Sequence, residues 1–449
     1  MYKRNKILEL FEEQKDFYEE KVENGIERYR KGDATIIVAD KNGNPVVNAK
    51  ISAKQTSHEF KFGANLFMLD ELETEEKNQI YKKYFADVFN MATLPFYWNT
   101  LEPERNKTRY DKDSPKIYRR PAPDLCLEFC EKHGIEPREH GLAFELFFPD
   151  WLYNASVEEI KTELERRYKE ISFRYADKIP TIEVTNEMEH LQGKTAFYDQ
   201  ADYVEWCFKL AEKYFKNNQL VINEHTSACW VDKCRATDKY YSYIQANILK
   251  GARIDAIGMQ YHIFRKKEEV YNYSKSVLNP KLLYKHLDLY SDFGKPLQVT
   301  EVTIPAYSWK PEDEELQAQT IEKLYSLWFS YPNVEQIIYW NLVDGYAHLW
   351  DNDLEKIKAS QGDMTIGENY YYGGLLRFDL SPKPAYYKIK ELTQQKWRTN
   401  VNLETNQNGT TSFRGFYGNY KLEITIDGKT TTKQITLSKK GQNNFNITL

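Results

Sequence analysis

Cysteine is scarce in this sequence, and its placement argues against two common architectures. The five cysteines are an odd and scattered set, which disfavours a framework of disulfides. Cys126 and Cys130 lie four residues apart on a predicted helix, yet the two further ligands that a zinc site needs are not evident near them. We therefore predict buried thiols that pack as small apolar side chains, and no metal site.

Long apolar runs are missing as well. No stretch approaches the ~18 apolar residues of a membrane-spanning helix. The first nine residues, MYKRNKILE, lack the apolar core of a signal peptide. The chain as given is therefore expected in the cytoplasm, although a secreted chain whose leader had been removed would read the same.

Charge of one sign is not in excess. The 62 Lys and Arg against 67 Asp and Glu leave a net charge of −5, with both signs spread along the chain. This balance gives no footprint for nucleic acid or for an anionic membrane. A glycine-rich phosphate loop, a Gly-x-Ser-x-Gly elbow and a His-Glu-x-x-His helix are all missing, so the sequence calls for no cofactor. It leaves the oligomeric state open.

Aromatic residues, in contrast, are abundant and make up 15% of the chain. Most are expected to fill a large core. Others could line a sugar cleft, where ring faces stack on the C–H faces of pyranoses, and composition alone does not separate the two roles.

Short apolar segments alternate with longer helical patterns through most of the chain. Residues 156–176 and 202–217 have helical periodicity. Alternation of strand and helix predicts a parallel α/β fold, and eight repeats predict a closed (β/α)8 barrel, the TIM barrel. The eight candidate strands lie at or near residues 60–64, 88–91, 139–144, 182–184, 220–222, 256–259, 297–299 and 336–340.

The N-terminal part of the chain differs from this pattern. Residues 6–31 predict a charged amphipathic helix, and residues 34–53 alternate around a turn as a β-hairpin does. We assign residues 1–56 to this extension and residues 57–397 to the barrel.

The C-terminal part differs too. Residues 398–449 are rich in Thr, Asn and Gly and predict a small, sandwich-like all-β module. Its aromatic residues, Phe413, Phe416, Tyr417 and Tyr420, either bind polysaccharide or serve packing.

Glu187 and Glu301 suggest the chemistry most directly. Glu187 ends the segment TIEVTNE and Glu301 ends LQVTE, and both segments are typical of buried strands. Side chains at the carboxyl ends of barrel strands point into the active site. Two carboxylates there are the minimum equipment for cleaving a glycosidic bond, one as acid/base and one as nucleophile. Two surface glutamates are the alternative, which the strand pattern disfavours.

Other side chains near strand ends fit the same site. Asn186 could hydrogen-bond the sugar 2-hydroxyl, a contact that strengthens in an oxocarbenium-like transition state. His262 could hydrogen-bond the nucleophile and hold it ionised, or be an ordinary core histidine. Trp340 could lie under the bound sugar as a stacking floor, or be a core tryptophan. His225 is a weaker candidate, for which a surface or supporting role is expected.

Together these segments resemble glycoside hydrolase family 10, the retaining β-1,4-xylanases built on a (β/α)8 barrel. The resemblance extends from about residue 34 to residue 392. Its motifs are FKFG at 60–63, LEPER at 101–105, PDW at 149–151, VTNE at 184–187, IGMQYH at 257–262, TE at 300–301, and LLRFD through PKPAYY at 375–387.

The resemblance implies roles for individual residues. Glu187 would be the acid/base and Glu301 the nucleophile. The substrate-binding set that it implies contains Asn186, Gln260, His262 and Trp340, together with Tyr97, Trp98, His140, Glu145 and Tyr261.

The chain departs from this family in two stretches that read the sugar. The family's usual TPENEMKW corresponds here to TLPFYW at 93–98, so Tyr97 takes the lysine position. Its GHTLVWH corresponds to EHGLAFE at 139–145, so Glu145 replaces the final histidine. Loss of hydrogen-bonding partners changes discrimination between sugars. An extra carboxylate at Glu145 would also raise the pKa of neighbouring carboxyl groups unless cationic or hydroxyl groups bind it.

We therefore expect a retaining β-glycoside hydrolase that acts on xylan-type β-1,4 oligosaccharide or polysaccharide. An exo-acting β-glycosidase on a different sugar, or on an apolar plant glycoside, is the alternative that Phe96 and Tyr97 favour. A non-catalytic carbohydrate-binding protein on the same scaffold is the alternative from another class, and the presence of both carboxylates argues against it.

Overall fold

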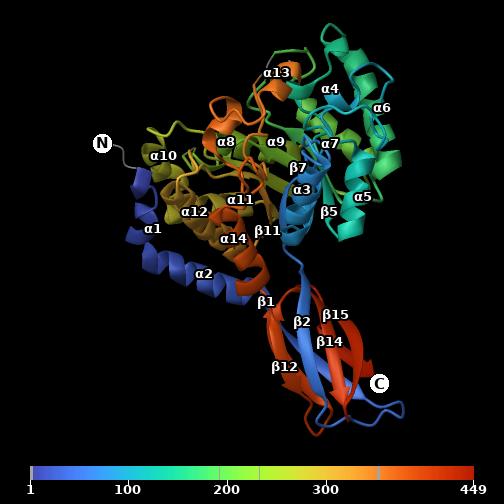
Figure 1. Cartoon of the computed structure of the whole chain (residues 1–449). Helices are drawn as coiled ribbons and strands as arrows, with labels where there is room; N and C mark the ends of the chain where they lie inside the picture. The colour runs from blue at the N-terminus through green and yellow to red at the C-terminus, as the bar shows by residue number, and fades with distance from the viewer. Residues whose placement is uncertain (1–3, 192, 232, 351–353) are drawn as a thin grey trace.

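The computed structural model describes residues 4–191, 193–231, 233–350 and 354–449, which form two lobes. Figure 1 shows a large lobe wrapped in helices and a smaller lobe made of strands. Among the described residues, every helix is too short or too polar to cross a bilayer.

Eight parallel strands close the barrel of the large lobe: β3 (Lys61–Asn65), β4 (Met91–Pro95), β5 (Glu136–His140), β6 (Thr181–Asn186), β7 (Gln219–Glu224), β8 (Ala256–Met259), β10 (Leu297–Thr303) and β11 (Val334–Tyr339). Neighbours follow the order of the chain, and the ring closes where Ile337 of β11 pairs with Phe62 of β3. A short strand, β9 (Tyr261–His262), follows β8 and pairs with β10. The predicted TIM-barrel fold is confirmed.

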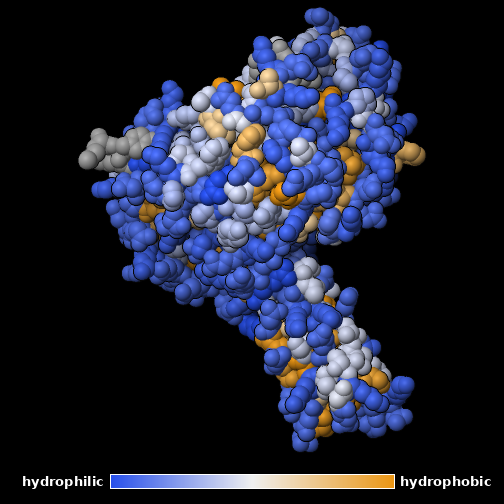
Figure 2. Space-filling view, in the orientation of Figure 1, coloured by the Kyte–Doolittle hydropathy of each residue, from blue (hydrophilic) through white to orange (hydrophobic). Residues whose placement is uncertain are grey.

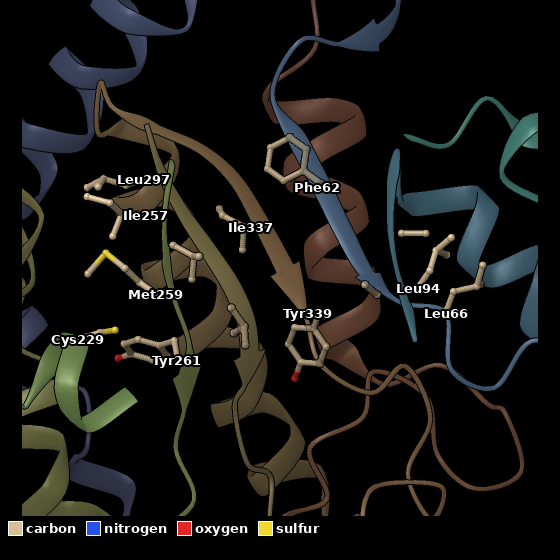
Figure 3. Packing of buried hydrophobic residues seen from close by; sticks show 14 of the residues in the cluster. Phe62, Leu66, Leu94, Cys229, Ile257, Met259, Tyr261, Leu297, Ile337 and Tyr339 are labelled. Carbon is tan, nitrogen blue, oxygen red and sulfur yellow. The ribbon is translucent and has the colours of Figure 1, made fainter. Parts of the chain in front are cut away.

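Helices cover the outside of this ring (Figure 1). The strands are therefore buried on both faces, and β6 and β10 are buried at every position. Figure 3 shows Ile257, Leu297 and Ile337 from three neighbouring strands in this packing.

The helices are α1 (Glu9–Glu13), α2 (Lys15–Tyr29), α3 (Glu75–Val88), α4 (Trp98–Leu101), α5 (Pro123–His133), α6 (Val157–Tyr175), α7 (Tyr203–Tyr214), α8 (Thr226–Trp230), α9 (Lys239–Leu249), α10 (Val270–Val277), α11 (Pro280–Ser291), α12 (Pro311–Ser330), α13 (Leu354–Ala359) and α14 (Pro384–Glu391).

Three predicted boundaries are wrong. Helix α3 extends to Val88 and β4 begins at Met91, because Phe85 and Val88 belong to the buried face at the end of the helix. Strand β5 occupies 136–140 instead of 139–144. The prediction searched for apolar residues, whereas this buried strand contains Arg138 and Glu139. The predicted helix at 6–31 is interrupted at Gln14 and ends at Tyr29, where β1 follows.

The small lobe is a β-sandwich built from both ends of the chain. Its strands are β1 (Lys31–Ala39), β2 (Lys50–His58), β12 (Asn400–Glu404), β13 (Thr410–Phe416), β14 (Gly418–Ile426), β15 (Lys429–Leu437) and β16 (Asn444–Thr448). One sheet has the order β13-β1-β16 and the other has the order β12-β2-β14-β15. In Figure 1 the blue N-terminal strands lie between red C-terminal ones.

The hairpin predicted for residues 34–53 is present only at its turn, where Ala39 and Pro45 form an antiparallel bridge, and the longer pairing is wrong. β1 and β2 lie in different sheets, and each has C-terminal strands on both sides. Alternation with a period of two identifies a strand with one buried face, but it does not identify the partner strand. The side chains of Phe413, Phe416 and Tyr420 are buried, which fits the packing role that the sequence left open.

Aromatic side chains join the two lobes. Phe416 of β13 and His58 of β2 pack against Phe329 of α12, with ring centroids 6.1 Å and 6.3 Å away, and Trp397 stacks on the same Phe329 ring at 4.2 Å. The buried guanidinium of Arg30 donates to the backbone carbonyls of Phe329, Tyr331 and Val334. The narrow waist in Figure 2 is thus tied together by packing and by hydrogen bonds.

Candidate active site

A cavity of about 300 Å³ lies at the carboxyl ends of the barrel strands. Residues of β6, of β10 and of the turn after β11 all contribute to its lining. The predicted site residues that line it are Tyr97, His140, Asn186, Glu187, Gln260, His262, Glu301 and Trp340.

Glu187 follows β6 directly, in a left-handed backbone conformation with φ of +52°. Gln260 donates from Nε2 to Glu187 Oε1 at 3.0 Å. His190 Nδ1 lies 3.9 Å from Glu187 Oε2, and its ring stacks on His225 with centroids 3.8 Å apart. Burial alone would raise the pKa of Glu187, but the contact with His190 and the hydrogen bond from Gln260 hold it below its ordinary value. His225, the weaker candidate, thus has a supporting place in the cavity wall.

Glu301 lies within β10 and accepts hydrogen bonds at both carboxylate oxygens. Asn223 donates from Nδ2 to Oε1 at 3.2 Å, and His262 Nε2 lies 3.2 Å from Oε2. The other ring nitrogen of His262 lies 2.9 Å from Thr303 Oγ1. The predicted contact between His262 and Glu301 is therefore present.

The ionised state predicted for Glu301 does not follow from this contact. Burial raises the pKa of Glu301 to about 8; His140 opposes the shift, and Glu183 and Glu187 add to it. Burial also lowers the pKa of His262 to about 4, so its imidazole is neutral near pH 7 and brings no positive charge to the carboxylate.

A chain of amide side chains joins the two carboxylates. Asn223 Nδ2 donates to Asn186 Oδ1 at 2.9 Å as well as to Glu301. Gln260 Nε2 donates to the same Asn186 oxygen at 3.2 Å as well as to Glu187. Asn186 Oδ1 is thus held from two sides, which fixes the orientation of its amide. The prediction overlooked Asn223, although it is the second-last residue of β7 and the same strand-end argument would have found it.

A line of buried polar groups leads from the cavity wall into the barrel. The Tyr97 hydroxyl lies 2.9 Å from His140 Nε2, and His140 donates from Nδ1 to Glu183 Oε1 at 2.7 Å. Arg138 pairs with the other oxygen of Glu183, and neither side chain is exposed. Burial lowers the pKa of His140, but Glu183 outweighs it and holds the pKa above its ordinary value. Tyr97, at the position of the expected lysine, is therefore held by His140.

Three predicted site residues do not line the cavity. Trp98 packs against Phe148 and Trp151 and donates from Nε1 to Glu102 at 3.0 Å. Tyr261 points to the helical shell, where it packs on Trp328 and lies beside Cys229 in Figure 3. Successive residues of a strand face opposite sides, so Tyr261 is turned outward when Gln260 and His262 face the cavity.

Glu145 is the third of these residues. It is buried in a short 3-10 turn and accepts a hydrogen bond from the backbone N–H of Lys194 at 2.9 Å. The extra carboxylate predicted beside the sugar is thus turned away from the cavity.

Aromatic side chains form one wall of the cavity. Phe67, Tyr97, Phe144 and Trp340 make a separate apolar cluster, against which Phe147 packs. Trp350 stands at the rim with 68% of its surface exposed. Phe67, Phe147 and Trp350 were not predicted, because they lie outside the strand-end motifs.

Metal ligands do not gather in the described part of the chain. No group of three or more His, Cys, Asp or Glu is placed to hold an ion there. All five cysteines are buried and unbridged, as predicted.

Residues 52–392 match the model of glycosyl hydrolase family 10. The anti-sigma-I factor RsgI6 of Acetivibrio thermocellus is 25% identical over 413 residues, which cover 90% of this chain and 46% of that protein. The β-1,4-xylanase of Dictyoglomus thermophilum is 25% identical over 62% of this chain and 83% of its own length. Endo-1,4-beta-xylanase 1 of Arabidopsis thaliana is 23% identical over 89% of this chain, which spans 37% of that protein.

Solved structures of xylanases share the fold. Xylanase 10B from Thermotoga petrophila, solved with xylobiose, has a TM-score of 0.58 at 22% identity and covers 75% of this chain and 95% of its own. Native xylanase 10B from Thermotoga maritima has a TM-score of 0.58 at 21% identity, with coverages of 75% and 96%. The chain spans less than half the length of the anti-sigma factor and of the Arabidopsis enzyme. Because the family match covers most of its residues, the chain belongs to glycosyl hydrolase family 10.

Proposed function

We propose that the chain is a retaining β-glycoside hydrolase, with Glu187 as acid/base and Glu301 as nucleophile. One observation carries the proposal: the two carboxylates line the same cavity at the carboxyl ends of β6 and β10. The amide chain through Gln260, Asn186 and Asn223 fixes one relative to the other. A pair of carboxylates in fixed positions is what the double displacement requires.

The reaction proceeds in two steps. Glu301 attacks the anomeric carbon while Glu187 protonates the departing oxygen, which leaves a covalent glycosyl-enzyme. Glu187 then removes a proton from water, and the resulting attack on the anomeric carbon releases Glu301. The carboxyl groups should lie ~5–5.5 Å apart for this sequence of steps.

The two steps need one proton on the pair of carboxyl groups. The pKa of Glu301 is raised and that of Glu187 is lowered, so the pair holds one proton near neutral pH. In the free protein Glu301 holds that proton. Positive charge that develops at the anomeric carbon favours ionised Glu301, and this moves the proton to Glu187, where the leaving oxygen needs it.

Asn186 has a donor to offer the substrate. Its Oδ1 accepts from both Asn223 and Gln260, so its Nδ2 is the donor that faces outward for a sugar hydroxyl. A hydrogen bond to the 2-hydroxyl that strengthens in the transition state would lower the barrier.

The proposed substrate is a xylan-type β-1,4 oligosaccharide or polysaccharide. The xylanase relatives and the aromatic wall around Trp340 support this class. A second candidate is an exo-acting β-glycosidase on a different sugar or an apolar glycoside. It is favoured by Tyr97, whose hydroxyl is engaged with His140 and whose ring extends the aromatic wall.

Product analysis with xylo-oligosaccharides tests the proposal. The wild-type protein and a control with an exposed substitution, Glu212→Gln, should release products that retain the anomeric configuration. Glu301→Gln should lose activity by at least about 10³-fold. Inversion of configuration would overturn the retaining mechanism. Binding without turnover would support a non-catalytic carbohydrate-binding protein, and cleavage restricted to other β-glycosides would support the second candidate.

A further inference from the structure

Two consecutive arginines line the same cavity, and the proposed steps do not use them. Arg119 and Arg120 lie in the loop between α4 and α5, with 3% and 8% of their surfaces exposed. Arg119 has a left-handed backbone, with φ of +61°, which allows two successive side chains to face one cavity. Arg109 holds the loop by donating from Nη2 to the carbonyl of Arg120 at 3.1 Å.

Neither guanidinium has a carboxylate partner among the described residues. Arg119 Nη1 donates to the carbonyl of Tyr346, and Arg120 Nη1 donates to the carbonyl of Arg119 at 2.8 Å. The Nε atoms of both side chains are buried and have no acceptor in the described part of the chain. Buried charges are ordinarily paired, because removing a lone ion from water is costly. Two adjacent buried cations that form no ion pair with a described carboxylate therefore point to an anion that comes from outside the chain.

Their protein neighbours supply less negative charge than the two arginines carry. The Arg120 guanidinium carbon lies 4.2 Å from the centroid of the Tyr97 ring and 5.2 Å from that of Phe147. Such contacts stabilise a cation far less than an ion pair does. Glu368 also lines the cavity and attracts both guanidinium groups, but it accepts its side-chain hydrogen bond from Asn341 Nδ2 at 3.1 Å, and one carboxylate does not neutralise two arginines.

We propose that Arg119 and Arg120 bind a carboxylate on the substrate, so that the cavity takes a β-linked glycan containing a uronic acid. This inference rests on the proposed function of the cavity. The planar fork of a guanidinium matches the two oxygens of a carboxylate. The sugar that carries the carboxylate lies against the aromatic wall at Phe67, whose ring centroid is 5.6 Å from the Arg119 guanidinium carbon and 5.5 Å from that of Arg120.

The arginines also select one orientation of the sugar. The pair of Glu187 and Glu301, which keeps one negative charge near neutral pH, lines the same cavity and repels a second anion. A uronic acid is therefore accepted when its carboxylate faces the arginines and rejected when it faces the catalytic pair. Attraction on one side and repulsion on the other together set the register of the chain.

Binding to the Glu301→Gln protein tests this without turnover. The probes are a xylo-oligosaccharide substituted with glucuronic acid, an oligosaccharide with a terminal β-linked glucuronic acid, and each of these after reduction of its carboxyl group to an alcohol. Calorimetry should show at least one acidic probe bound roughly tenfold or more tightly than its reduced form, with an affinity that falls as salt is added. Which probe responds tells whether the carboxylate belongs to a side group or to the backbone sugar.

Variants assign the effect to the arginine pair. Arg120→Gln should weaken binding of the acidic probe by roughly tenfold or more and change binding of the reduced probe less than about twofold. Arg120→Lys should restore part of the difference, and the exposed control Arg28→Gln should have no effect. Equal binding of acidic and reduced probes would overturn the inference, whatever the variants do. Cleavage of neutral oligosaccharides with no preference for acidic ones would support the proposed hydrolase and contradict the uronic-acid site. Arginine-dependent binding without cleavage would support the uronic-acid site and contradict the proposed hydrolase.

Discussion

Glu301 holds a proton more tightly in the folded protein than in the unfolded chain. Burial raises its pKa from 4.5 to about 8. Between these two pH values the folded state binds more protons than the unfolded state, so the free energy of unfolding falls as the pH rises. Below this window the carboxyl group is neutral in both states, and above it the full cost of a buried charge is present. The residue proposed as nucleophile thus weakens the fold at neutral and alkaline pH.

Replacing Glu301 with an uncharged isostere should therefore stabilise the protein. We expect Glu301→Gln to raise the Tm by roughly 1–4 °C at pH 8 and to change it little at pH 4.5. The glutamine oxygen still accepts from Asn223, and neutral His262 can accept from the new amide nitrogen by changing its tautomer. Scanning calorimetry at both pH values checks this, with Glu212→Gln as the control. A Tm at pH 8 equal to or below that of the wild type would show that the carboxylate carries no such cost.

The sequence was enough to predict those site residues that lie at the ends of strands with a regular apolar pattern. Glu187, Glu301 and Asn186 end runs of β-branched residues, so their direction follows from barrel geometry alone. Arg119 and Arg120 lie in a loop without periodicity, and only the folded chain shows that they are buried and form no ion pair with a described carboxylate. Glu145 illustrates the reverse case, since its sequence position beside a strand says nothing of the backbone N–H that turns it away.

Strands β5 and β6 carry charge into the interior of the barrel. Arg138 and Glu183 form a fully buried ion pair, and Glu183 also accepts from His140. Removing one member of such a pair leaves an unpaired buried charge, which is costly. The pair also explains why the predicted position of β5 was wrong, because charged side chains at 136–139 break the apolar pattern that the prediction followed.

We expect Arg138→Met to lower the free energy of unfolding by about 3–5 kcal/mol. The matched control is Lys61→Met, which removes a partly exposed pair with Glu136 and should cost less than about 1 kcal/mol. Urea unfolding followed by tryptophan fluorescence measures both. Similar losses for the two variants would mean that the buried pair has no special weight in the barrel.

Strands from the two ends of the chain pair with each other in the small lobe. β1 and β2 each lie between strands from residues 400–448, and the sandwich core combines Ile36 and Ile51 with Leu422. Pairing between segments so distant in the chain leaves no periodic trace, so the sequence pattern revealed the strands but not their partners. The barrel, whose neighbours follow chain order, was predictable for the opposite reason.

Deleting residues 398–449 should therefore damage more than the C-terminal lobe. The deletion would expose the hydrogen-bonding edges of β1 and β2, and it would also expose their apolar side. We expect the shortened chain to aggregate and co-expression of residues 398–449 as a separate chain to restore soluble protein. Size-exclusion chromatography measures this. A monomeric shortened chain with the Tm of the full chain would show that the C-terminal strands form an independent module.

The shared sandwich has a consequence for synthesis on the ribosome. β1 and β2 emerge early, but their first partner, β12, emerges only after residues 59–399 have been made. At ~5–20 residues per second this interval lasts roughly 20–70 s. During this time two strands with open edges wait beside a barrel that is still growing, so the nascent chain depends on its N-terminal helices or on chaperones to keep them from pairing with other chains.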